Sequence, residues 1–275
     1  MTSPEDRTIL ITGATDGVGR ALAHELASTG AALVLHGRSA EKGRQLLAEL
    51  RAATGNDRLS YERADFSSLK EIHALADRVG ELDRLDVLVN NAGMGVELTR
   101  RESEEGLELT FQVDYLSTYI LSCRLAPLLT RSAPSRIVNV SSAGQAPIDF
   151  RDVQLEHGWS GGQAYCQAKL AQIMLTFDLA EALAGTGVTV NALHPASYMP
   201  TKIVTHLFTP QSTLAEGVAN VLRLVVEPAY AEQTGLYLNR ATVTTADAQA
   251  YDTQARARLR SLSDQLTGTP FPAAV

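Results

Sequence analysis

Hydrophobic and polar residues alternate along this chain in two repeating patterns. Short, largely apolar runs predict buried strands, and these runs are Thr8–Thr12, Ala32–His36, Val87–Val89, Arg136–Val140 and Val188–Leu193. Leu59–Ala64 is predicted as a further strand, although it is more polar. Between them, apolar residues return every three or four positions, which is the spacing of one helix face. This spacing predicts helices at Gly19–Thr29, from a Ser39 cap to about Ala53, at Leu69–Val79, at about Glu104–Leu129, from near Gln163, and at about Ala246–Leu266.

Strands and helices that alternate in this way indicate right-handed βαβ crossovers. Continuously apolar strands are typical of a parallel sheet that is covered on both faces. No internal repeat, low-complexity tract or Pro/Gly/Ser-rich linker divides the sequence. We therefore expect one α/β domain over residues 1–275, with a tail at Phe271–Val275 that frays.

Composition and charge exclude several classes of protein. The 275 residues are 45% hydrophobic and 20% charged, as in ordinary globular proteins, and the formal net charge is -7. No basic stripe is present, so no nucleic-acid partner is expected. The N-terminus lacks the pattern of a signal peptide, and no run of about 18 apolar residues could form a membrane span. We therefore expect a cytoplasmic protein.

Cysteine and histidine give no indication of a metal site. Cys123 and Cys166 are far apart and lack metal-ligand spacing, so both are interpreted as free thiols in a reducing compartment. The histidines, including His36 and His194, are scattered and are expected on helix faces, in loops or in structural positions.

Three glycines follow the first strand in the segment Thr12-Gly13-Ala-Thr-Asp-Gly17-Val-Gly19. Glycine permits a tight turn, close approach of the backbone to a pyrophosphate, and close packing of helix on strand. The helix that follows offers free N–H groups and its positive end to phosphates. Any strand-turn-helix connection can use glycine, but the strand before and the helix after favour a dinucleotide site.

The second strand ends at His36-Gly37-Arg38-Ser39, where NAD sites usually place Asp or Glu to bind the ribose hydroxyls. No carboxylate is present here to repel a 2′-phosphate, and the planar guanidinium of Arg38 suits one. We therefore predict NADP(H) in preference to NAD(H). The alternative interpretation is that Arg38 is a solvated loop residue.

Two further strand ends carry candidate binding residues. Asp65 could accept a hydrogen bond from an adenine amino group, with Phe66 shaping the pocket, or it could equally be an acidic residue at a helix N-terminus. The segment Asn90-Asn91-Ala92-Gly93 follows the fourth strand, where small residues and amides fit a cofactor groove, although the same tetrapeptide is an ordinary turn signal.

Tyr165 and Lys169 are candidates for proton transfer. Residues four apart lie on one helix face, so the phenol and the ammonium group can approach the same space. A free phenol has a pKa of about 10, and a neighbouring cation favours the phenolate. Ser142, at the end of the fifth strand, could hydrogen-bond the substrate oxygen. A Tyr and a Lys at this spacing are common on surface helices, so the pair alone does not establish the chemistry.

Together these residues resemble the short-chain dehydrogenase/reductase family. The elements that match, in the family's order, are Thr12–Gly19, Asp65, Asn90–Gly93, Ser141-Ser142, Tyr165–Lys169 and His194-Pro195. The resemblance implies a Rossmann-type, doubly wound sheet of about seven parallel strands with helices on both faces. It also implies that Tyr165 is the general acid/base, that Lys169 lowers its pKa and holds the nicotinamide ribose, and that Ser142 orients the carbonyl. The cofactor-binding residues implied are Gly13, Thr15, Gly17, Val18, Gly19, Arg38, Ser39, Asp65, Phe66, Asn90, Ala92, Gly93, Tyr165, Lys169, Pro195 and Ser197.

Within the family, the chain is similar to the retinol dehydrogenase-like branch. The similar stretches are Ala164–Ala171, Ile148–Gln154 and Leu259–Leu266. Loops at about 143–163 and 196–212 are expected to border the substrate. Two positions depart from the family: Asp114 stands where Asn anchors a water in the proton relay, and Ala196 stands where glycine is common.

The sequence thus predicts an NADP(H)-dependent oxidoreductase that interconverts a carbonyl and an alcohol on a small or lipophilic substrate. The alternative is an NADP(H)-binding sensor or scaffold with little turnover, which Asp114 and Ala196 keep open and the intact Ser142, Tyr165 and Lys169 disfavour. An epimerase or dehydratase on this fold would usually carry a larger substrate domain. A homodimer or homotetramer is compatible with the resemblance.

Overall fold

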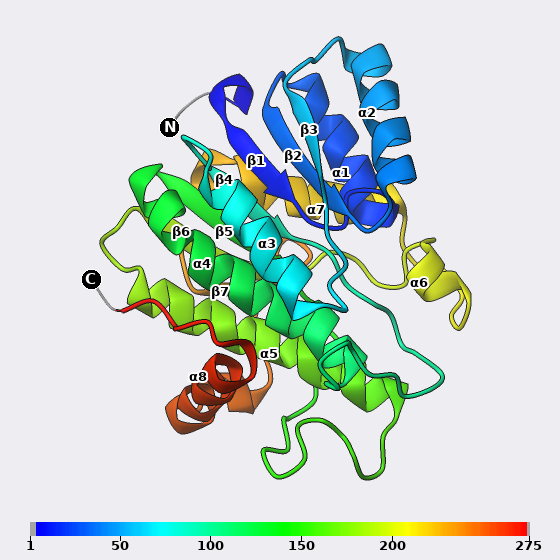
Figure 1. The fold of residues 1–275 in the computed structure, drawn as a ribbon, viewed down its shortest axis with the longest axis vertical. Helices are drawn as coiled ribbons and strands as arrows, with labels where there is room; N and C mark the ends of the chain where they lie inside the picture. The colour runs from blue at the N-terminus through cyan, green and yellow to red at the C-terminus, as the bar shows by residue number, and fades with distance from the viewer. Residues whose placement is uncertain (1–3, 274–275) are drawn as a thin grey trace.

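The apolar runs form the strands of one sheet in the computed structural model, which describes residues 4–273 (Figure 1). The spatial order of the strands is β3-β2-β1-β4-β5-β6-β7-β8. Their bounds are β1 (Thr8–Ile11), β2 (Ala32–Gly37), β3 (Leu59–Arg63), β4 (Val87–Asn90), β5 (Ser135–Val140), β6 (Val188–His194), β7 (Leu236–Asn239) and β8 (Thr242–Val243). The first seven strands are parallel, and the two-residue β8 adds an antiparallel edge to β7, so the sheet has one strand more than predicted.

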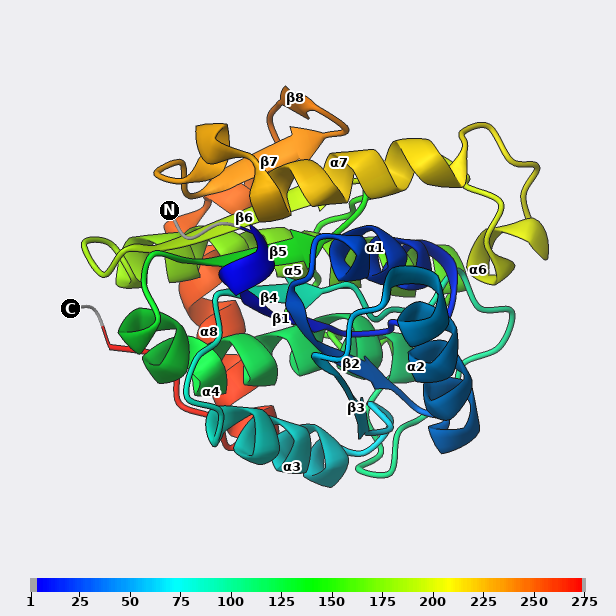
Figure 2. The same ribbon diagram turned by 90° about the horizontal axis from the view of Figure 1, so that it is seen from above.

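Helices cover both faces of the sheet (Figure 2), and each face has its own apolar core. One face packs against α1 (Gly17–Ser28), α2 (Ala40–Thr54) and α7 (Leu214–Val226). The other packs against α3 (Leu69–Gly80), α4 (Ser117–Arg131) and α5 (Gly161–Ala182). Because both faces are buried, the central strands are apolar at nearly every position, which explains their continuous hydrophobic runs. The fold is therefore the α/β Rossmann type that the sequence predicts.

The order of the strands reverses between β1 and β4. In doubly wound sheets this reversal opens a crevice beyond the carboxyl ends of the strands, where ligands bind. The turns after β1, β2, β3 and β4 all lie at this edge, together with the residues that follow β5 and β6. The candidate residues identified from sequence are concentrated in these turns.

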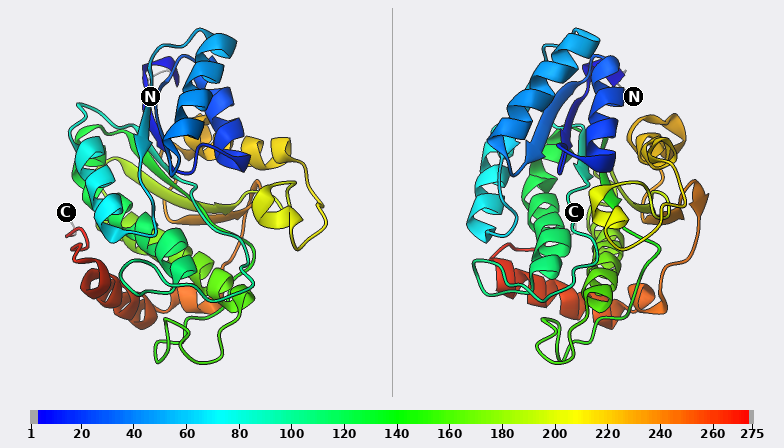
Figure 3. Two further views of the ribbon diagram at one scale, coloured as in Figure 1. Left: turned by 45° about the vertical axis from the view of Figure 1, so that its right-hand side comes forward. Right: turned by 90° about the vertical axis from the view of Figure 1, so that its right-hand side faces the viewer.

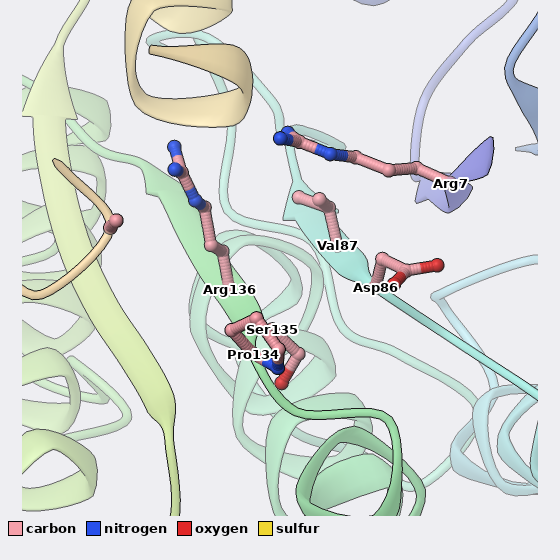
Figure 4. A pocket seen from close by; sticks show the side chains of 7 residues that line it. Arg7, Asp86, Val87, Pro134, Ser135 and Arg136 are labelled. Atoms are coloured by element: carbon pink, nitrogen blue, oxygen red, sulfur yellow. The ribbon is translucent and has the colours of Figure 1, made fainter. Parts of the chain in front are cut away.

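At the amino ends of the strands, opposite the crevice, two buried arginines contact the end of α7. Arg7 and Arg136 are both buried, at 5% and 4% exposure, and they line a cavity of only about 10 Å³ (Figure 4). Arg7 donates to the carbonyl oxygen of Val225 (2.8 Å), and Arg136 donates to that of Leu224 (2.7 Å). Burial lowers the pKa of Arg136 to about 10. Both guanidinium groups therefore satisfy carbonyls at the C-terminus of α7, where the helix dipole favours cations.

The helix predicted at Glu104–Leu129 begins later than expected. Glu102 and Glu108 instead form an isolated bridge, and a π-helix at Phe111–Leu116 precedes α4. The carboxylate of Glu108 accepts the backbone N–H of Phe111 (2.6 Å) and so marks the true start of helical structure. Periodicity alone could not locate this start, because the apolar spacing continues through the loop.

The predicted C-terminal helix at Ala246–Leu266 also differs in the structure. A 3-10 turn at Ala248–Tyr251 is followed by α8 (Thr253–Thr267), because Asp252 is extended and its side chain caps α8 by accepting from Gln254 and Ala255. Helix α8 lies on the outer side of α4 and α5 (Figure 3).

The tail beyond α8 was expected to fray, but its described part is packed. Phe271 lies against Tyr119, with ring centroids 6.4 Å apart, and Arg260 stacks on it at 5.3 Å. Residues 274–275 of the predicted tail lie outside the described residues.

Two remaining bounds also shift. Helix α5 begins at Gly161, two residues before the position expected, so the first predicted substrate loop ends at Ser160. The second predicted loop contains a short helix, α6 (Lys202–Thr205). Among residues 4–273, no helix combines the length and the apolar character needed to cross a membrane.

Candidate active site

The glycine-rich turn after β1 is so closely packed that no side chain fits at Gly13 or Gly19. A Cβ atom on Gly13 would lie 2.8 Å from the Cα of Ala92, and one on Gly19 would lie 2.4 Å from the side-chain nitrogen of Asn91. Gly13 and Gly17 also have positive φ values of 66° and 52°. The turn is consequently a bare backbone cradle at the N-terminus of α1, with Thr15 and Val18 within it.

The turn after β4 is hydrogen-bonded to this cradle. The hydroxyl of Thr12 accepts the backbone N–H groups of Asn91 and Ala92, both at 2.9 Å. The side-chain amide of Asn91 donates to the carbonyl of Thr12 (2.8 Å). Asn90 points elsewhere, since its amide donates to Asn139 (2.8 Å) and Ser122 (3.0 Å) inside the core. Asn90 thus supports the strand ends from beneath.

In the turn after β2, the guanidinium of Arg38 lies beside the N-terminus of α2. Arg38 is exposed and forms no hydrogen bond or ion pair with any described residue. The hydroxyl of Ser39 caps α2 by accepting from Lys42 (3.3 Å), and the phenol of Tyr61 donates to the carbonyl of Ser39 (2.8 Å). A helix N-terminus next to a guanidinium is chemically suited to a phosphate group.

The carboxylate of Asp65 shapes the turn after β3 and lies three residues before Ser68, the N-cap of α3. Its Oδ1 accepts the backbone N–H of Ser67 (3.0 Å), which shapes the turn before α3, and its other carboxylate oxygen remains available. Phe66 is buried and stacks on His36, with ring centroids 4.3 Å apart and an interplanar angle of 10°.

Tyr165 and Lys169 lie one turn apart near the start of α5, on the face predicted from their spacing. The Nζ atom of Lys169 is 5.6 Å from the centroid of the Tyr165 ring. It also lies 3.2 Å from the Oε1 atom of Gln172 and 3.4 Å from the carbonyl oxygen of Val140. Its ammonium group is therefore held by acceptors on three sides once Asp114 is included.

Asp114 and Lys169 form a buried ion pair with Oδ2 and Nζ 3.1 Å apart. Asp114 is completely buried in the π-helix, and its Oδ1 accepts the backbone N–H of Met94 (2.6 Å). Burial raises the pKa of Asp114, and the charge of Lys169 opposes that rise. A Cβ on Gly93 would lie 3.3 Å from both charged atoms, so glycine leaves the pair room at the crevice.

Ser142 and Tyr165 converge on a space that Gly144 leaves open. A Cβ at Gly144 would lie 3.5 Å from the Oγ of Ser142, 3.7 Å from the Tyr165 ring and 3.3 Å from the Sγ of Cys166. Burial raises the pKa of Tyr165; Lys169 and the Ser142 hydroxyl lower it, and Asp114 raises it. The effect of Lys169 has the predicted sign, but desolvation outweighs it in the protein alone.

Ser142 is positioned by residues that the sequence did not reveal. Its carbonyl accepts from the phenol of Tyr237 (2.9 Å) on β7 and from the amide of Gln145 (3.2 Å), while its Oγ accepts the N–H of Gly144 (3.0 Å). Tyr237 is buried, and burial raises its pKa to about 12. No local motif marks Tyr237, because it lies 95 positions from its partner.

The segment after β6 places the last predicted residues. The hydroxyl of Ser197 lies 3.1 Å from the Nε2 of His194, and the carbonyl of Pro195 accepts from Asn220 (2.8 Å). Burial lowers the pKa of His194 to about 4, in keeping with a structural role. Ala196 is buried in the core beside α7 and its φ is not positive, so its methyl is accommodated.

Helix α6 and its flanking loop lie over the glycine-rich turn. Lys202 pairs with Asp16 (2.8 Å), and Thr201 is next to Gly17. Partly exposed apolar side chains gather along this segment: Tyr198, Ile203, Leu207 and Phe208. On the other side, the indole of Trp159 donates to Glu108 (3.3 Å) and anchors the loop before α5. Within residues 4–273 no group of three His, Cys, Asp or Glu side chains is arranged to hold a metal ion.

Comparison with known proteins identifies the class that this fold and site define. The model for short chain dehydrogenases matches residues 7–212, so the chain belongs to the short-chain dehydrogenase family and is an oxidoreductase. Human retinol dehydrogenase 12 is 34% identical over 275 aligned positions, which cover 95% of this chain and 86% of the relative. This likeness places the chain in the retinol dehydrogenase-like branch.

Solved structures share the fold. An uncharacterised protein from Mycobacterium paratuberculosis matches with a TM-score of 0.82 and 28% identity, covering 99% of this chain and 97% of the other. The RhlG protein of Pseudomonas aeruginosa, solved as an active-site complex with NADP, matches with a TM-score of 0.69 and 28% identity over 87% of this chain and 97% of its own.

Proposed function

We propose that this protein is an NADP(H)-dependent oxidoreductase that interconverts a carbonyl and an alcohol, with Tyr165 as the general acid/base. The observation that carries the proposal is the convergence of Tyr165, Lys169 and Ser142 at the edge of the sheet where the glycine-rich cradle lies. A phenol beside a buried ammonium group and a serine hydroxyl can exchange a proton with a substrate oxygen.

The residues at this edge fit a dinucleotide. A pyrophosphate needs backbone without side chains and a helix N-terminus, and the turn at Gly13–Gly19 offers both because Gly13, Gly17 and Gly19 carry no side chain and the turn leads directly into α1. A 2′-phosphate needs donors, which Arg38 and the N-terminus of α2 supply. The NADP complex of the related RhlG protein also supports NADP(H) over NAD(H).

The protein's own groups would act in the following way. The nicotinamide, when bound, supplies or accepts the hydride. In the reductive direction Tyr165 donates its phenolic proton to the carbonyl oxygen, and the hydroxyl of Ser142 hydrogen-bonds the same oxygen. The Oγ of Ser142 already accepts from Gly144, so its own proton is free to point at the substrate. Lys169 stabilises the phenolate that results, because a nearby cation favours the charged form of Tyr165.

The charge balance of the site favours carbonyl reduction. Burial and the carboxylate of Asp114 both raise the pKa of Tyr165, which keeps the phenol protonated and able to donate. Reduction needs the neutral phenol and oxidation needs the phenolate. Burial and Asp114 thus act against the oxidative direction at neutral pH, and Lys169 opposes them.

A lipophilic substrate fits the loops that border the site. Tyr198, Ile203, Leu207 and Phe208 are partly exposed on the segment beside the cradle, and the rings of Tyr198 and Phe208 pack in a tilted arrangement with centroids 4.9 Å apart. Exposed apolar residues grouped beside a catalytic crevice are typical of a surface that receives an apolar ligand. The name of the relative retinol dehydrogenase 12 agrees with this class of substrate.

The test is NADPH consumption by the purified protein over a panel of apolar aldehydes and ketones. Tyr165→Phe is expected to lower kcat by about 10²- to 10⁴-fold, because it removes the acid. Tyr230→Phe, in the 3-10 turn at Pro228–Tyr230 that follows α7, is the matched control and should leave turnover unchanged. Full activity in Tyr165→Phe would refute the role of the phenol.

One observation supports the second candidate, an NADP(H)-binding sensor or scaffold. The buried ion pair of Asp114 with Lys169 occupies the place where the family's Asn anchors a water. Tight NADPH binding by wild-type protein without turnover on a broad panel would favour this alternative.

A further inference from the structure

His36 is completely enclosed at the end of β2, and its imidazole contacts the turns that follow two neighbouring strands. It is 2% exposed. Its Nδ1 lies 3.3 Å from the backbone nitrogen of Gly13, and its Nε2 lies 3.0 Å from the carbonyl oxygen of Ala64. Its ring stacks on Phe66 with an interplanar angle of 10°. One side chain therefore joins the ends of β1, β2 and β3.

The two partners fix the tautomer of His36. Gly13 offers only an N–H group, so Nδ1 must be the acceptor. Ala64 offers only a carbonyl oxygen, so Nε2 must carry the proton and donate it. A proton added to Nδ1 would face the N–H of Gly13 and break that contact. The imidazole works only in its neutral form.

Each turn held by His36 contains residues proposed to contact the dinucleotide. Gly13 opens the pyrophosphate cradle, Arg38 follows two residues after His36, and Asp65 and Phe66 directly follow Ala64. The backbone of His36 adds a further link, since its carbonyl accepts the N–H of Ala14 (2.8 Å). The spacing of the three turns therefore depends on a residue that cannot itself touch solvent.

We propose that His36 is a positioning residue for the cofactor, whose two ring hydrogen bonds hold the pyrophosphate turn at the correct distance from the adenosine-side turns. This inference rests on the proposed NADP(H) function. Preorganised turns lose less conformational freedom when the ligand binds, so the contribution of His36 is to cofactor affinity rather than to the chemical step.

The surroundings of His36 keep it in the neutral form that this role requires. Burial lowers its pKa to about 4, with its bond to Ala64 and the charge of Asp65 opposing that shift and Arg78 adding to it. The ring is consequently neutral over the whole range in which the enzyme would be assayed.

Two substitutions at His36 separate the hydrogen bond from the packing. His36→Phe keeps a flat ring against Phe66 and removes both nitrogens. His36→Asn places an amide oxygen near the position of Nδ1, where it can accept from Gly13. Leu33→Ala, at the opposite end of β2 and buried to 1% exposure, is the control for general loss of stability.

We expect His36→Phe to raise the Kd for NADPH, measured by fluorescence titration, by about tenfold. The KM for NADPH should rise in parallel while kcat at saturating NADPH stays within about twofold. His36→Asn keeps only the bond to Gly13, so its Kd should lie between those of His36→Phe and the wild type, and Leu33→Ala should leave the Kd unchanged while lowering Tm.

Two results would overturn the inference alone: wild-type affinity for NADPH in His36→Phe, or an equal loss of affinity in Leu33→Ala. Wild-type protein with no affinity for NADPH would instead overturn the proposed function, and the inference with it. The wild-type titration therefore distinguishes the two failures.

Discussion

Helix α5 carries two buried ionic groups that differ in what surrounds them. Near its start, Lys169 pairs with Asp114 (3.1 Å) beside the crevice, under a glycine and next to Tyr165. Nine residues later, Asp178 pairs with Arg260 (2.7 Å) and Arg256 (3.3 Å) on α8, away from the crevice. Burial raises the pKa of both aspartates, and the paired cations oppose that rise, so both pairs carry an energetic cost of burying charge.

The two ion pairs differ in the groups on which their charges act. A buried ion pair is often no more stabilising than apolar residues of the same shape, so its presence alone does not show a purpose. The pair at Asp178 joins two helices and serves packing. The pair at Asp114 lies beside the Tyr165 phenol, and its two charges shift the pKa of that phenol in opposite directions. Under the proposed function, the same helix uses charge for architecture at one place and for reactivity at another.

The largest effect is expected when the reactive pair loses its cation. Lys169→Met should lower kcat/KM for carbonyl reduction by about 10²- to 10⁴-fold, because the phenolate loses its neighbouring charge. It should also lower the free energy of unfolding by about 3 kcal/mol, since Asp114 is left buried and unpaired. Steady-state kinetics and urea denaturation measure the two effects.

The double variant Lys169→Met/Asp114→Asn sharpens this result. It removes both charges, so it should recover most of the stability while activity stays lost. Recovery of activity together with stability would contradict a chemical role for Lys169.

The structural pair should behave in the opposite way. Arg256→Met leaves Asp178 with Arg260 as its remaining partner and should lower the free energy of unfolding by about 2 to 3 kcal/mol. The kcat at temperatures well below the transition should stay unchanged, because no reacting group is touched. A large loss of kcat in folded Arg256→Met would contradict the interpretation that the ion pair at Asp178 is only structural.

A smaller effect is expected when only the anion of the reactive pair is neutralised. Asp114 raises the pKa of Tyr165, so Asp114→Asn should lower that pKa. The alkaline limb of the reduction profile, where the neutral phenol is lost, should therefore move to lower pH by about one unit. The acidic limb of the oxidation profile should move in the same direction.

The pH dependence of kcat/KM in both directions is the measurement. Asp178→Asn makes the same chemical change at the structural pair and should leave both limbs in place. A reduction limb that moves to higher pH in Asp114→Asn would contradict the assignment.

The smallest effect is expected at the residue that positions Ser142. Tyr237→Phe removes the phenol donor to the carbonyl of Ser142, but the amide of Gln145 still donates there. We expect kcat to fall by about three- to tenfold with an unchanged KM for NADPH. A changed KM for NADPH with constant kcat would show that Tyr237 acts on the cofactor side instead.

Most of the fold could be predicted from local sequence patterns. The strands were predicted because parallel strands buried on both faces are apolar throughout, and the turn at Gly13–Gly19 because its close contacts permit only glycine. Tyr165 and Lys169 were predicted to share a face because helix geometry fixes that relation at four residues.

Contacts between distant segments could not be predicted in this way. The imidazole of His36 was expected on a helix face or in a loop, yet its partners lie in the turns after β1 and β3, 23 and 28 positions away. The positions of these two backbone groups depend on the completed sheet.

The start of the helical stretch that leads into α4 was missed for a local reason. The loop that ends at Glu108 has an apolar spacing like that of a helix, so periodicity could not locate the first turn.

The packing of the C-terminal segment has a consequence for the synthesis of the protein. Tyr115, in the π-helix beside Asp114, bonds Ser263 on α8 (2.7 Å), and the phenol of Tyr119 on α4 donates to the carbonyl of Thr269 (3.1 Å). These contacts span about 150 residues, so a chain emerging from the ribosome holds its central helices without their outer cover until α8 and Thr269 have been synthesised. The packing of the central helices is therefore completed later in synthesis than the strands of the nucleotide-binding half of the sheet.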